Sequence, residues 1–243
     1  MNIVRHIPNS ITSMNLLCGS LGVIFTLQNR FDLAFYLMLA AAVCDFFDGF
    51  AARLLKAYSD IGKELDSLAD MVSFGLLPSL MAYKAMEIAY GESLFCYIPL
   101  IIAVFSALRL AKFNLDERQS DNFIGLPTPA CAMLCGSFVY YLTMEPESFI
   151  HTLASTPYFI PTAAIILALL LICEIPMFSM KFKKNMKADV VMFRLRILFA
   201  LTLIASAVLT CILGLNWSFI VMLTFTAYIM LNVISYLLHR QQR

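Results

Sequence analysis

Two short stretches contain the residues whose types and spacing could do chemistry. Asp45 and Asp48 lie in one apolar run, and Asp66 and Asp70 lie at the start of the next. At about 100° per helical residue, the members of each pair fall on one face of their helix. Because the connection between the two runs is short, we expect an antiparallel pair of helices whose acidic faces meet.

Four carboxylates at one place in a membrane need compensating charge. Each costs ~2.5–3.5 kcal/mol on insertion scales, and four together also repel one another. Arg53 supplies one positive charge, whereas two divalent cations would supply four. All-oxygen ligands suit the hard cations Mg²⁺ and Mn²⁺. The sequence therefore predicts that two such cations bind at Asp45, Asp48, Asp66 and Asp70.

An acid-lined ion pathway in a transporter is the alternative, because it also uses intramembrane acids. A relay tolerates acids strung along the membrane normal, whereas these cluster at one depth. Small residues accompany them: Gly49 and Ala52 lower the helix surface beside Asp48, and Gly62 opens the start of the next helix. Helix packing competes as an explanation for each glycine, but beside the acids we favour access for a bulky diphosphate.

The elements that must position these residues are membrane helices. The chain has 243 residues, of which 61% are hydrophobic and only 14% charged, well below the roughly 25% charged residues of soluble domains. Because a crossing helix needs ~20 apolar residues, we predict an all-α, polytopic membrane helix bundle with about eight crossings. These fall at 12–29, 33–56, 66–90, 94–113, 126–144, 157–179, 191–213 and 216–238.

The basic residues predict the orientation of this bundle, since Lys and Arg near helix ends are retained on the cytoplasmic side. With both termini inside, every lysine and arginine except Arg30 and Lys84 falls on the cytoplasmic side. The hydrophilic connections 114–123 and 181–189 are then cytoplasmic. The first apolar run lacks the features of a cleavable signal and should remain as the first helix.

The remaining composition excludes other classes of protein. Seventeen basic residues against 16 acidic ones give a net charge of +1, so no nucleic-acid partner is expected. The sequence contains no C-x-x-C pair, so it indicates neither a zinc site nor a disulfide framework. We interpret the cysteines as small core residues; they are Cys18, Cys44, Cys96, Cys131, Cys135, Cys173 and Cys211.

The acidic stretches match a family signature. The pattern D-x-x-D-G-x-x-A-R-x(8)-G-x-x-x-D-x-x-x-D runs from Asp45 to Asp70 without a departure and resembles that of the CDP-alcohol phosphotransferases. The resemblance implies a dinuclear metal site in a cytoplasm-facing cavity and transfer of a phosphoalcohol from a CDP-linked donor with release of CMP. It also implies one membrane domain, with a six-helix catalytic core at 5–178, two additional helices at 190–238, and a homodimer.

Family roles carry over to matching positions. Asp45, Asp48 and Asp66 resemble ligands of the first metal, and Asp66 bridges to the second. Asp70 resembles both a ligand of the second metal and the general base. The positions that resemble contacts to CDP-diacylglycerol are Asn9, Thr12, Gly49, Arg53 and Ser59. Asn9 and Thr12 are also good residues for the end of a helix.

The chemistry agrees with these parts. Two metals clamp a diphosphate and neutralise the charge that develops on the leaving CMP. A hydroxyl is a poor nucleophile at neutral pH, and a carboxylate within reach can accept its proton. By its place on the third helix, Asp70 is the candidate base.

Other segments bear on the acceptor alcohol. Residues 65–75 (LDSLADMVSFG), 108–114 (LRLAKFN) and 123–130 (FIGLPTPA) resemble the serine-using branch of the family. We therefore expect phosphatidyl transfer from CDP-diacylglycerol to L-serine, with glycerol 3-phosphate as the alternative acceptor. The expected location is a prokaryotic inner membrane, with the active site on the cytoplasmic side.

An acceptor with a carboxylate needs a cation near the metal site. Arg109 and Lys112, close to the cytoplasmic end of the fourth helix, are available. Equally, both could be topology-setting charges that snorkel to the interface. Glu174, interpreted as an intramembrane acid of the sixth helix, could meet an ammonium group.

Overall fold

A computed structural model describes residues 6–116, 123–178 and 190–240 of the chain. Nearly all of this part is helical, and only two short segments pair as an antiparallel ribbon. In chain order the elements are α1 (His6–Leu27), α2 (Phe31–Leu54), α3 (Asp60–Asp70), the π-helix η2 (Met71–Leu76), α4 (Leu77–Tyr90), the 3₁₀-helix η3 (Leu94–Leu100), α5 (Ile101–Leu115), β1 (Phe123–Ile124), α6 (Thr128–Met144), α7 (Phe149–Ala154), α8 (Phe159–Ile172), β2 (Pro176–Met177), α9 (Val190–Leu213) and α10 (Ser218–Arg240).

The prediction of a polytopic helix bundle is confirmed. Within the described residues, six helical stretches are long and apolar enough to cross a membrane; they are His6–Leu27, Phe31–Leu54, Asp60–Tyr90, Leu94–Leu115, Phe193–Leu213 and Ser218–Leu238. The predicted crossings at 126–144 and 157–179 correspond to the shorter helices α6, of 17 residues, and α8, of 14 residues. The count of eight crossings therefore stays a prediction.

The sixth predicted crossing, 157–179, is too long because only part of this apolar run is helical. Helix α8 ends at Ile172, and Pro176 and Met177 form β2 instead of continuing the helix. Proline has no backbone N–H to donate within a helix. Glu174 lies beyond the helix and is exposed, so its interpretation as an intramembrane acid of the sixth helix is wrong.

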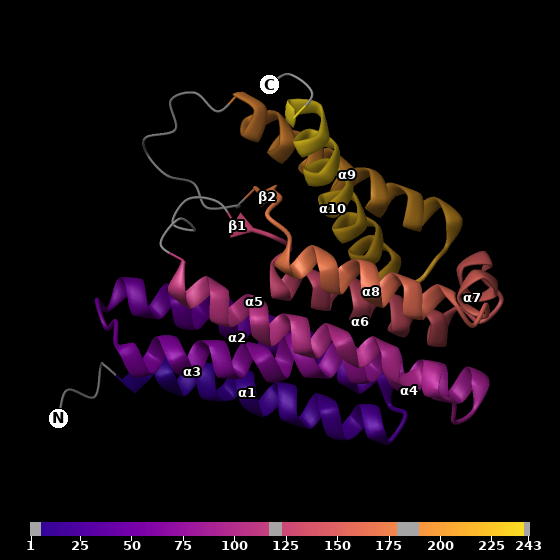
Figure 1. The fold of residues 1–243 in the computed structure, drawn as a ribbon, viewed down its shortest axis with the longest axis horizontal. Coiled ribbons are helices and arrows are strands. Elements are labelled where there is room, and N and C mark those ends of the chain that lie inside the picture. Colours follow the sequence, from indigo (N-terminus) through magenta and orange to yellow (C-terminus); the bar gives the residue numbers. More distant parts are fainter. Residues whose placement is uncertain (1–5, 117–122, 179–189, 241–243) are drawn as a thin grey trace.

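The helices form two groups in space. Helices α1–α5 lie side by side as a long bundle, with α6 and α8 beside them and the α9–α10 hairpin above (Figure 1). Helix α1 packs along α2 and against α3, α5 packs against η2 and α8, and α10 packs on α6 and α9. The two strands lie between the bundle and the hairpin, at the end where α5 finishes.

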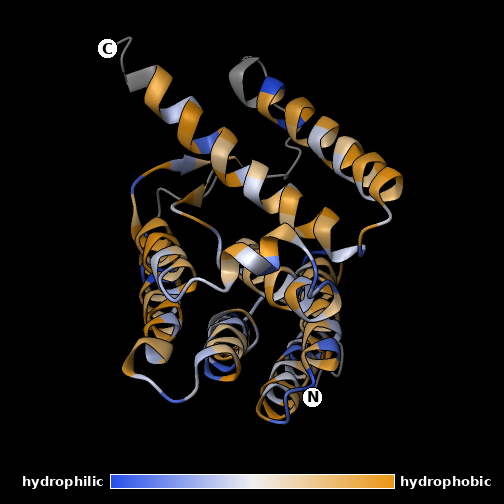
Figure 2. Cartoon of the chain, turned by 90° about the vertical axis from the view of Figure 1, so that its right-hand side faces the viewer, coloured by the Kyte–Doolittle hydropathy of each residue, from blue (hydrophilic) through white to orange (hydrophobic). Residues whose placement is uncertain are grey.

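Hydrophobic residues dominate all the long helices (Figure 2), and many of their side chains are exposed. On α1, for example, Met14, Leu17, Leu21 and Ile24 are exposed, and α9 exposes a comparable set. Water would penalise such extended apolar surfaces, whereas the acyl chains of a bilayer would not. The surface therefore agrees with the membrane assignment.

Glycines bring α1 into close contact with η2 and with the start of α4. A Cβ at Gly19 would lie 2.2 Å from Ser73 Oγ and 2.9 Å from Ser73 Cα, and a Cβ at Gly22 would lie 2.6 Å from Leu77 Cδ2. Only residues without a side chain permit this approach. The close packing fixes the polar side chains of α1 against the C-terminal end of α3.

Cysteine placement only partly matches the sequence-based interpretation. All seven cysteines are free; three are buried, whereas Cys18, Cys44 and Cys173 are half-buried and Cys211 is exposed. The interpretation as core residues is therefore wrong for Cys211, which faces outward from α9. The basic connection at 181–187 and most of the connection at 114–123 lie outside the described residues.

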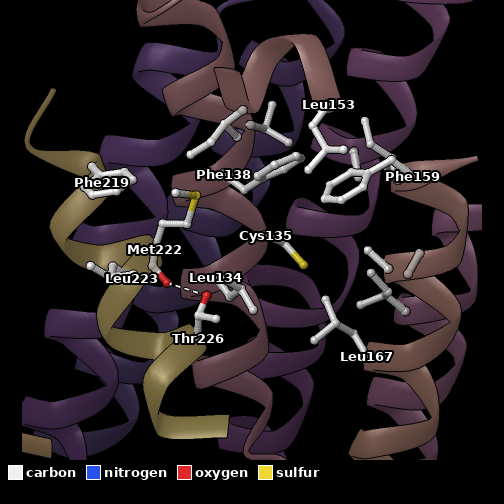
Figure 3. Close-up of a pocket in the computed structure, with 17 residues that line it drawn as sticks. Leu134, Cys135, Phe138, Leu153, Phe159, Leu167, Phe219, Met222, Leu223 and Thr226 are labelled. Atoms are coloured by element: carbon white, nitrogen blue, oxygen red, sulfur yellow. Dashed lines mark hydrogen bonds between the residues drawn. The ribbon is translucent and has the colours of Figure 1, made fainter. Parts of the chain in front are cut away.

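An apolar cavity of about 440 Å³ lies among α6, α8 and α10, at the end of the bundle where α7 is placed (Figure 3). Its wall includes Leu134, Phe138, Phe159, Leu167 and Met222. The Thr226 hydroxyl donates a hydrogen bond to the Met222 carbonyl oxygen, with 2.8 Å between the two oxygen atoms. The wall therefore presents almost no polar group to a ligand.

Candidate active site

Three of the four predicted acids form one cluster. Asp45 and Asp48, one turn apart near the end of α2, meet Asp66 of α3, and one carboxylate oxygen of each lies within 4.8 Å of the others. The loop between α2 and α3 is short, which turns the two helices back on each other as predicted. The acidic faces of α2 and α3 therefore meet, as expected from the sequence.

Helix α1 contributes a hydroxyl to this cluster. Thr12 Oγ1 donates to Asp48 Oδ2 at 2.7 Å, and both residues are buried. The sequence suggested Thr12 as a nucleotide contact or a helix-end residue; in the structure it lies within α1 and holds Asp48 in place.

Asp70 lies one helical turn beyond Asp66 and is more deeply placed, with 8% of its surface exposed. Asn15 Nδ2 donates to Asp70 Oδ1 at 3.2 Å, and Ser73 Oγ donates to the Asn15 carbonyl oxygen at 3.0 Å. The carboxylate of Asp70 is thus oriented by α1. It is not among the three acids whose oxygens lie within 4.8 Å of one another.

A cavity of about 220 Å³ opens beside Asp48 and Asp66, and α1, α2, the loop after α2 and the start of α3 line it. Because its mixed wall includes several polar side chains, we call it the polar cavity. Asn9, Ser59 and Gly62 belong to its wall. Ser59 is the N-cap of α3, where its Oγ accepts from the Gly62 N–H at 3.0 Å. This cap starts α3 so that its acidic face points at α2.

The two signature glycines play different parts around this cavity. A Cβ at Gly49 would meet nothing within 4 Å, so this glycine borders open space. A Cβ at Gly62 would lie 2.9 Å from both Asn9 Oδ1 and Ser59 Oγ, so this glycine makes room for two polar side chains. Arg53 is exposed on the last turn of α2 and does not belong to the cavity wall.

Arg109 of α5 is a buried arginine that interacts electrostatically with Asp70. It is only 6% exposed. Its Nη1 donates weakly to Thr128 Oγ1 at 3.4 Å, while its Nε and Nη2 are buried with no hydrogen-bond partner among the described residues. A buried guanidinium left this way is costly, so it is suited to an anion that binds from outside.

Helix α5 is held in register with α3 by polar contacts on the same side. Asn114 Nδ2 donates to Ser67 Oγ at 2.9 Å, and Lys63 Nζ donates to the Asn114 carbonyl oxygen at 2.9 Å. These bonds fix the height of Arg109 relative to the acids. Lys112 is exposed one turn along and, with Arg109 and Glu174, lines a small cavity.

The acidic cluster fits a divalent cation. Asp66 Oδ1 is buried and has no hydrogen-bond partner within the described ranges, and no salt bridge in this part of the chain neutralises the three acids. Three converging carboxylates with a spare oxygen form a hard, all-oxygen donor set. These residues could hold a metal ion.

Sequence reasoning missed Asn15. Its side chain contacts Asp70, and its Oδ1 is buried without a partner among the described residues. The available signal was its spacing: a polar residue three positions after Thr12 falls on the same face of an apolar helix. That face is the one that α1 turns toward the acids.

The acidic cluster and the adjoining cavity lie in a bundle of helices that are long and apolar enough to cross a membrane, and such a site suits a divalent cation and a phosphate-bearing substrate. The chain belongs to the CDP-alcohol phosphatidyltransferase family, whose family model matches residues 5–174. The match covers both acid-bearing helices and Arg109 and ends before α9. The predicted family is therefore confirmed.

Proteins with similar sequences occur in bacteria and archaea. The chain is 39% identical over 131 residues to the CDP-diacylglycerol--serine O-phosphatidyltransferase of Bacillus subtilis, which covers 54% of this chain and 73% of that protein. It is 35% identical over 136 residues to the Helicobacter pylori protein of the same name, covering 55% and 57%. Archaetidylserine synthase of Methanothermobacter thermautotrophicus is 33% identical over 140 residues, covering 56% and 58%.

Proposed function

We propose that this enzyme transfers the phosphatidyl group of CDP-diacylglycerol to the hydroxyl of L-serine and releases CMP. The names of the similar bacterial proteins support this acceptor. The observation that carries the proposal is the buried guanidinium of Arg109, which has two unpartnered nitrogen atoms among the described residues and interacts electrostatically with Asp70. It offers a cationic partner for the carboxylate of an amino-acid acceptor.

The donor would bind at the acidic cluster and the adjoining polar cavity. Asp45, Asp48, Asp66 and Asp70 would hold two divalent cations, Mg²⁺ or Mn²⁺. When bound, the cations neutralise the diphosphate and the charge on the departing CMP. The wall of the cavity, with Asn9, Thr12, Gly49 and Ser59, would hold the nucleotide. Arg53 lies outside this wall and would reach only the exposed part of the donor.

Asp70 would act as the general base. The serine hydroxyl oxygen attacks the phosphorus that carries diacylglycerol, a new P–O bond forms, and the bond to the CMP oxygen breaks on the opposite side. The hydroxyl proton passes to the Asp70 carboxylate. The Asn15 amide, which donates to Asp70 Oδ1, keeps the other oxygen directed toward the acceptor.

Arg109 would orient the acceptor through its carboxylate. A guanidinium presents a fork of N–H groups that matches two carboxylate oxygens, and Nε and Nη2 are adjacent donors. Lys112, exposed on the next turn, would add positive charge at the entrance. Glycerol 3-phosphate also carries an anion, which makes it the acceptor to test against serine.

The location and assembly follow from the same proposal. We place the acidic site on the cytoplasmic side of a prokaryotic inner membrane, where CDP-linked donors and serine meet. Labelling with a membrane-impermeant maleimide checks this orientation, using Arg30→Cys and Lys63→Cys in a variant whose seven native cysteines, all free, are replaced by serine or alanine. The homodimer implied by the family stays a prediction, which crosslinking in detergent can check.

CMP release tests the function directly. Purified protein in detergent receives CDP-diacylglycerol and Mn²⁺ or Mg²⁺ with serine, glycerol 3-phosphate, or no alcohol. We expect CMP release that depends on serine, and a loss of about 10²- to 10⁴-fold in Asp70→Asn, as for removal of a general base.

The control variant is Asp60→Asn, which changes an exposed acid at the start of the same helix α3 and should leave the rate unchanged. CMP release with glycerol 3-phosphate but not serine would contradict the acceptor. No CMP release with any alcohol would contradict the enzyme and favour the transporter alternative.

A further inference from the structure

The guanidinium of Arg109 lies against two aromatic rings, one of which belongs to a small two-stranded ribbon. Its Cζ lies 5.4 Å from the ring centroid of Phe113 on α5 and 5.7 Å from that of Phe123 on β1. The aromatic rings attract the cation and keep its plane in one orientation. The position of β1 therefore decides where Arg109 points.

The pairing of strand β1 with its partner strand is short. The strand pairs with β2 through only two residue pairs, Phe123 with Met177 and Ile124 with Pro176, and isolated ribbons of this size are unstable. The turn that follows gives some support. Gly125 has a φ of 78°, and its N–H donates to the Ile175 carbonyl oxygen at 2.9 Å.

Helix α10 holds the other strand. Asn232 Oδ1 accepts from the Phe178 N–H at 2.9 Å, and the Tyr228 hydroxyl donates to the Phe178 carbonyl oxygen at 3.1 Å. Both backbone groups of the residue after β2 are thus satisfied by two side chains one turn apart. Asn232 and Tyr228 are buried, and Asn232 Nδ2 donates to the Tyr228 carbonyl oxygen at 2.7 Å.

Tyr228 also lies near the guanidinium. It is close enough to Arg109 for a Coulombic interaction, and its ring packs on Phe178 at 4.9 Å between centroids. The contacts form one chain from α10 through β2 and β1 to Arg109. Its components come from segments far apart in the sequence.

The opposite end of α10 is fixed to the bundle. The Asn216 N–H donates to Glu145 Oε1 at 3.0 Å, and Trp217 stacks on Phe35 of α2 at 5.6 Å between centroids. Helix α10 therefore has a fixed position relative to the acids, although it lies beyond the residues matched by the family model, 5–174.

We propose that Tyr228 and Asn232 are positioning residues of the acceptor site, because they hold the β1–β2 ribbon against Arg109. This inference rests on the proposed function in one respect, namely that Arg109 binds the acceptor anion. A helix outside the matched family region would then tune the affinity for the acceptor without touching the donor.

The experiment compares Asn232→Leu and Tyr228→Phe with the unmodified protein. Each variant keeps the overall shape of the side chain and removes its bond to Phe178. Since a hydrogen bond contributes roughly 0.5–1.5 kcal/mol, we expect the KM for serine to rise about 2- to 10-fold in each. The KM for CDP-diacylglycerol and the kcat at saturating serine should stay within about twofold.

The matched control is Thr224→Val, on the turn of α10 before Tyr228. Thr224 is buried and shares a hydrogen bond with Ser206 of α9 at 3.3 Å, away from the ribbon. An unchanged KM for serine in both test variants would overturn the inference. Equal rises for serine in Thr224→Val, or equal rises for both substrates, would also overturn it, since they would indicate general loosening.

Hydrogen exchange separates this inference from the proposed function. Amides at 123–128 should exchange faster in Asn232→Leu than in Thr224→Val, and equal rates would overturn the inference whatever the enzyme's acceptor is. If the unmodified protein uses another alcohol, the proposed acceptor is wrong, and the KM for that alcohol becomes the readout. The positioning role is then tested by the same comparison of KM values between the test variants, Thr224→Val and the unmodified protein.

Discussion

A larger cavity and a smaller one lie toward opposite ends of the bundle, and only the smaller one borders groups that can do chemistry. The cavity of about 440 Å³ near α7 is lined by apolar side chains (Figure 3). The cavity of about 220 Å³ near the start of α3 includes Asp48 and Asp66 in its wall.

The difference between them is in unsatisfied polar groups rather than in size. Six buried side-chain atoms have no partner in the described part of the chain; four of them, on Asn15, Asp66 and Arg109, belong to the acidic end, and the other two are Ser106 Oγ and Ser218 Oγ. Leaving such groups unpaired costs free energy, which a bound ligand would recover. In this protein, polar groups without partners indicate the site better than volume does.

The largest effect should come from the acidic cluster. Asp66→Asn removes a charge at the point where α2 and α3 meet, and since a bound metal supplies several kcal/mol of charge stabilisation, we expect the rate of CMP release to fall about 1000-fold or more. Chelation of divalent cations with EDTA should abolish activity in the unmodified protein, and added Mg²⁺ or Mn²⁺ should restore it. Full activity after exhaustive chelation would remove the metal from the proposal.

The next effect concerns Arg109. Arg109→Ala should raise the KM for serine about 10- to 100-fold, because hydrogen bonds to charged groups contribute roughly 1.5–3 kcal/mol. Steady-state kinetics with each substrate varied in turn measures this change. In Arg109→Lys, which keeps the charge but loses the fork, the KM for serine should lie between the values of the unmodified protein and Arg109→Ala. An unaltered KM for serine in Arg109→Ala would mean that the arginine does not bind the acceptor.

A smaller effect is expected at Asn15. Asn15→Leu removes the donor to Asp70 Oδ1 and should lower kcat about 10-fold, the equivalent of one hydrogen bond to a charged group. Ser10→Ala changes an exposed hydroxyl on the same helix, bonded only to the His6 carbonyl oxygen in its own helix, and serves as the control. Equal kcat values in the two variants would show that Asp70 needs no orientation by α1.

The smallest effect should come from the apolar cavity. Ala163→Leu adds apolar atoms to its wall, and cavity filling commonly stabilises a fold by about 0.5–2 kcal/mol. We expect a higher Tm in detergent and both KM values within twofold. A KM for CDP-diacylglycerol that rises several-fold would instead mean that this cavity holds an acyl chain of the donor.

The sequence predicted the acids well because their spacing is local. Asp45 and Asp48 share a helix face through the 3.6-residue period, and a short loop is sufficient to bring Asp66 to them. Asn15 was missed because its contact with Asp70 depends on how closely α1 approaches, which Gly19 and Gly22 determine. Local periodicity contains no information on that distance.

Boundaries were least predictable where apolar sequence is not helical. Hydropathy continues through Ile175, Met177 and Phe178, yet these residues form or adjoin β2. Glu174 was accordingly assigned to a helix that ends at Ile172. The ribbon depends on Asn232, more than 50 positions away in the sequence, so its formation is a tertiary effect that overrides the local pattern.

The π-helix η2, directly after Asp70, has a consequence for how the long stretch Asp60–Tyr90 can vary. A π-helical turn accommodates one extra residue compared with an α-helix, and one residue corresponds to about 100° of rotation. The segment therefore sets the angle around the helix axis between the acidic face of α3 and the apolar face of α4. Deleting a single residue within Met71–Leu76 would leave both halves helical and equally apolar, yet it would turn the carboxylates away from α2 or the α4 face away from the core.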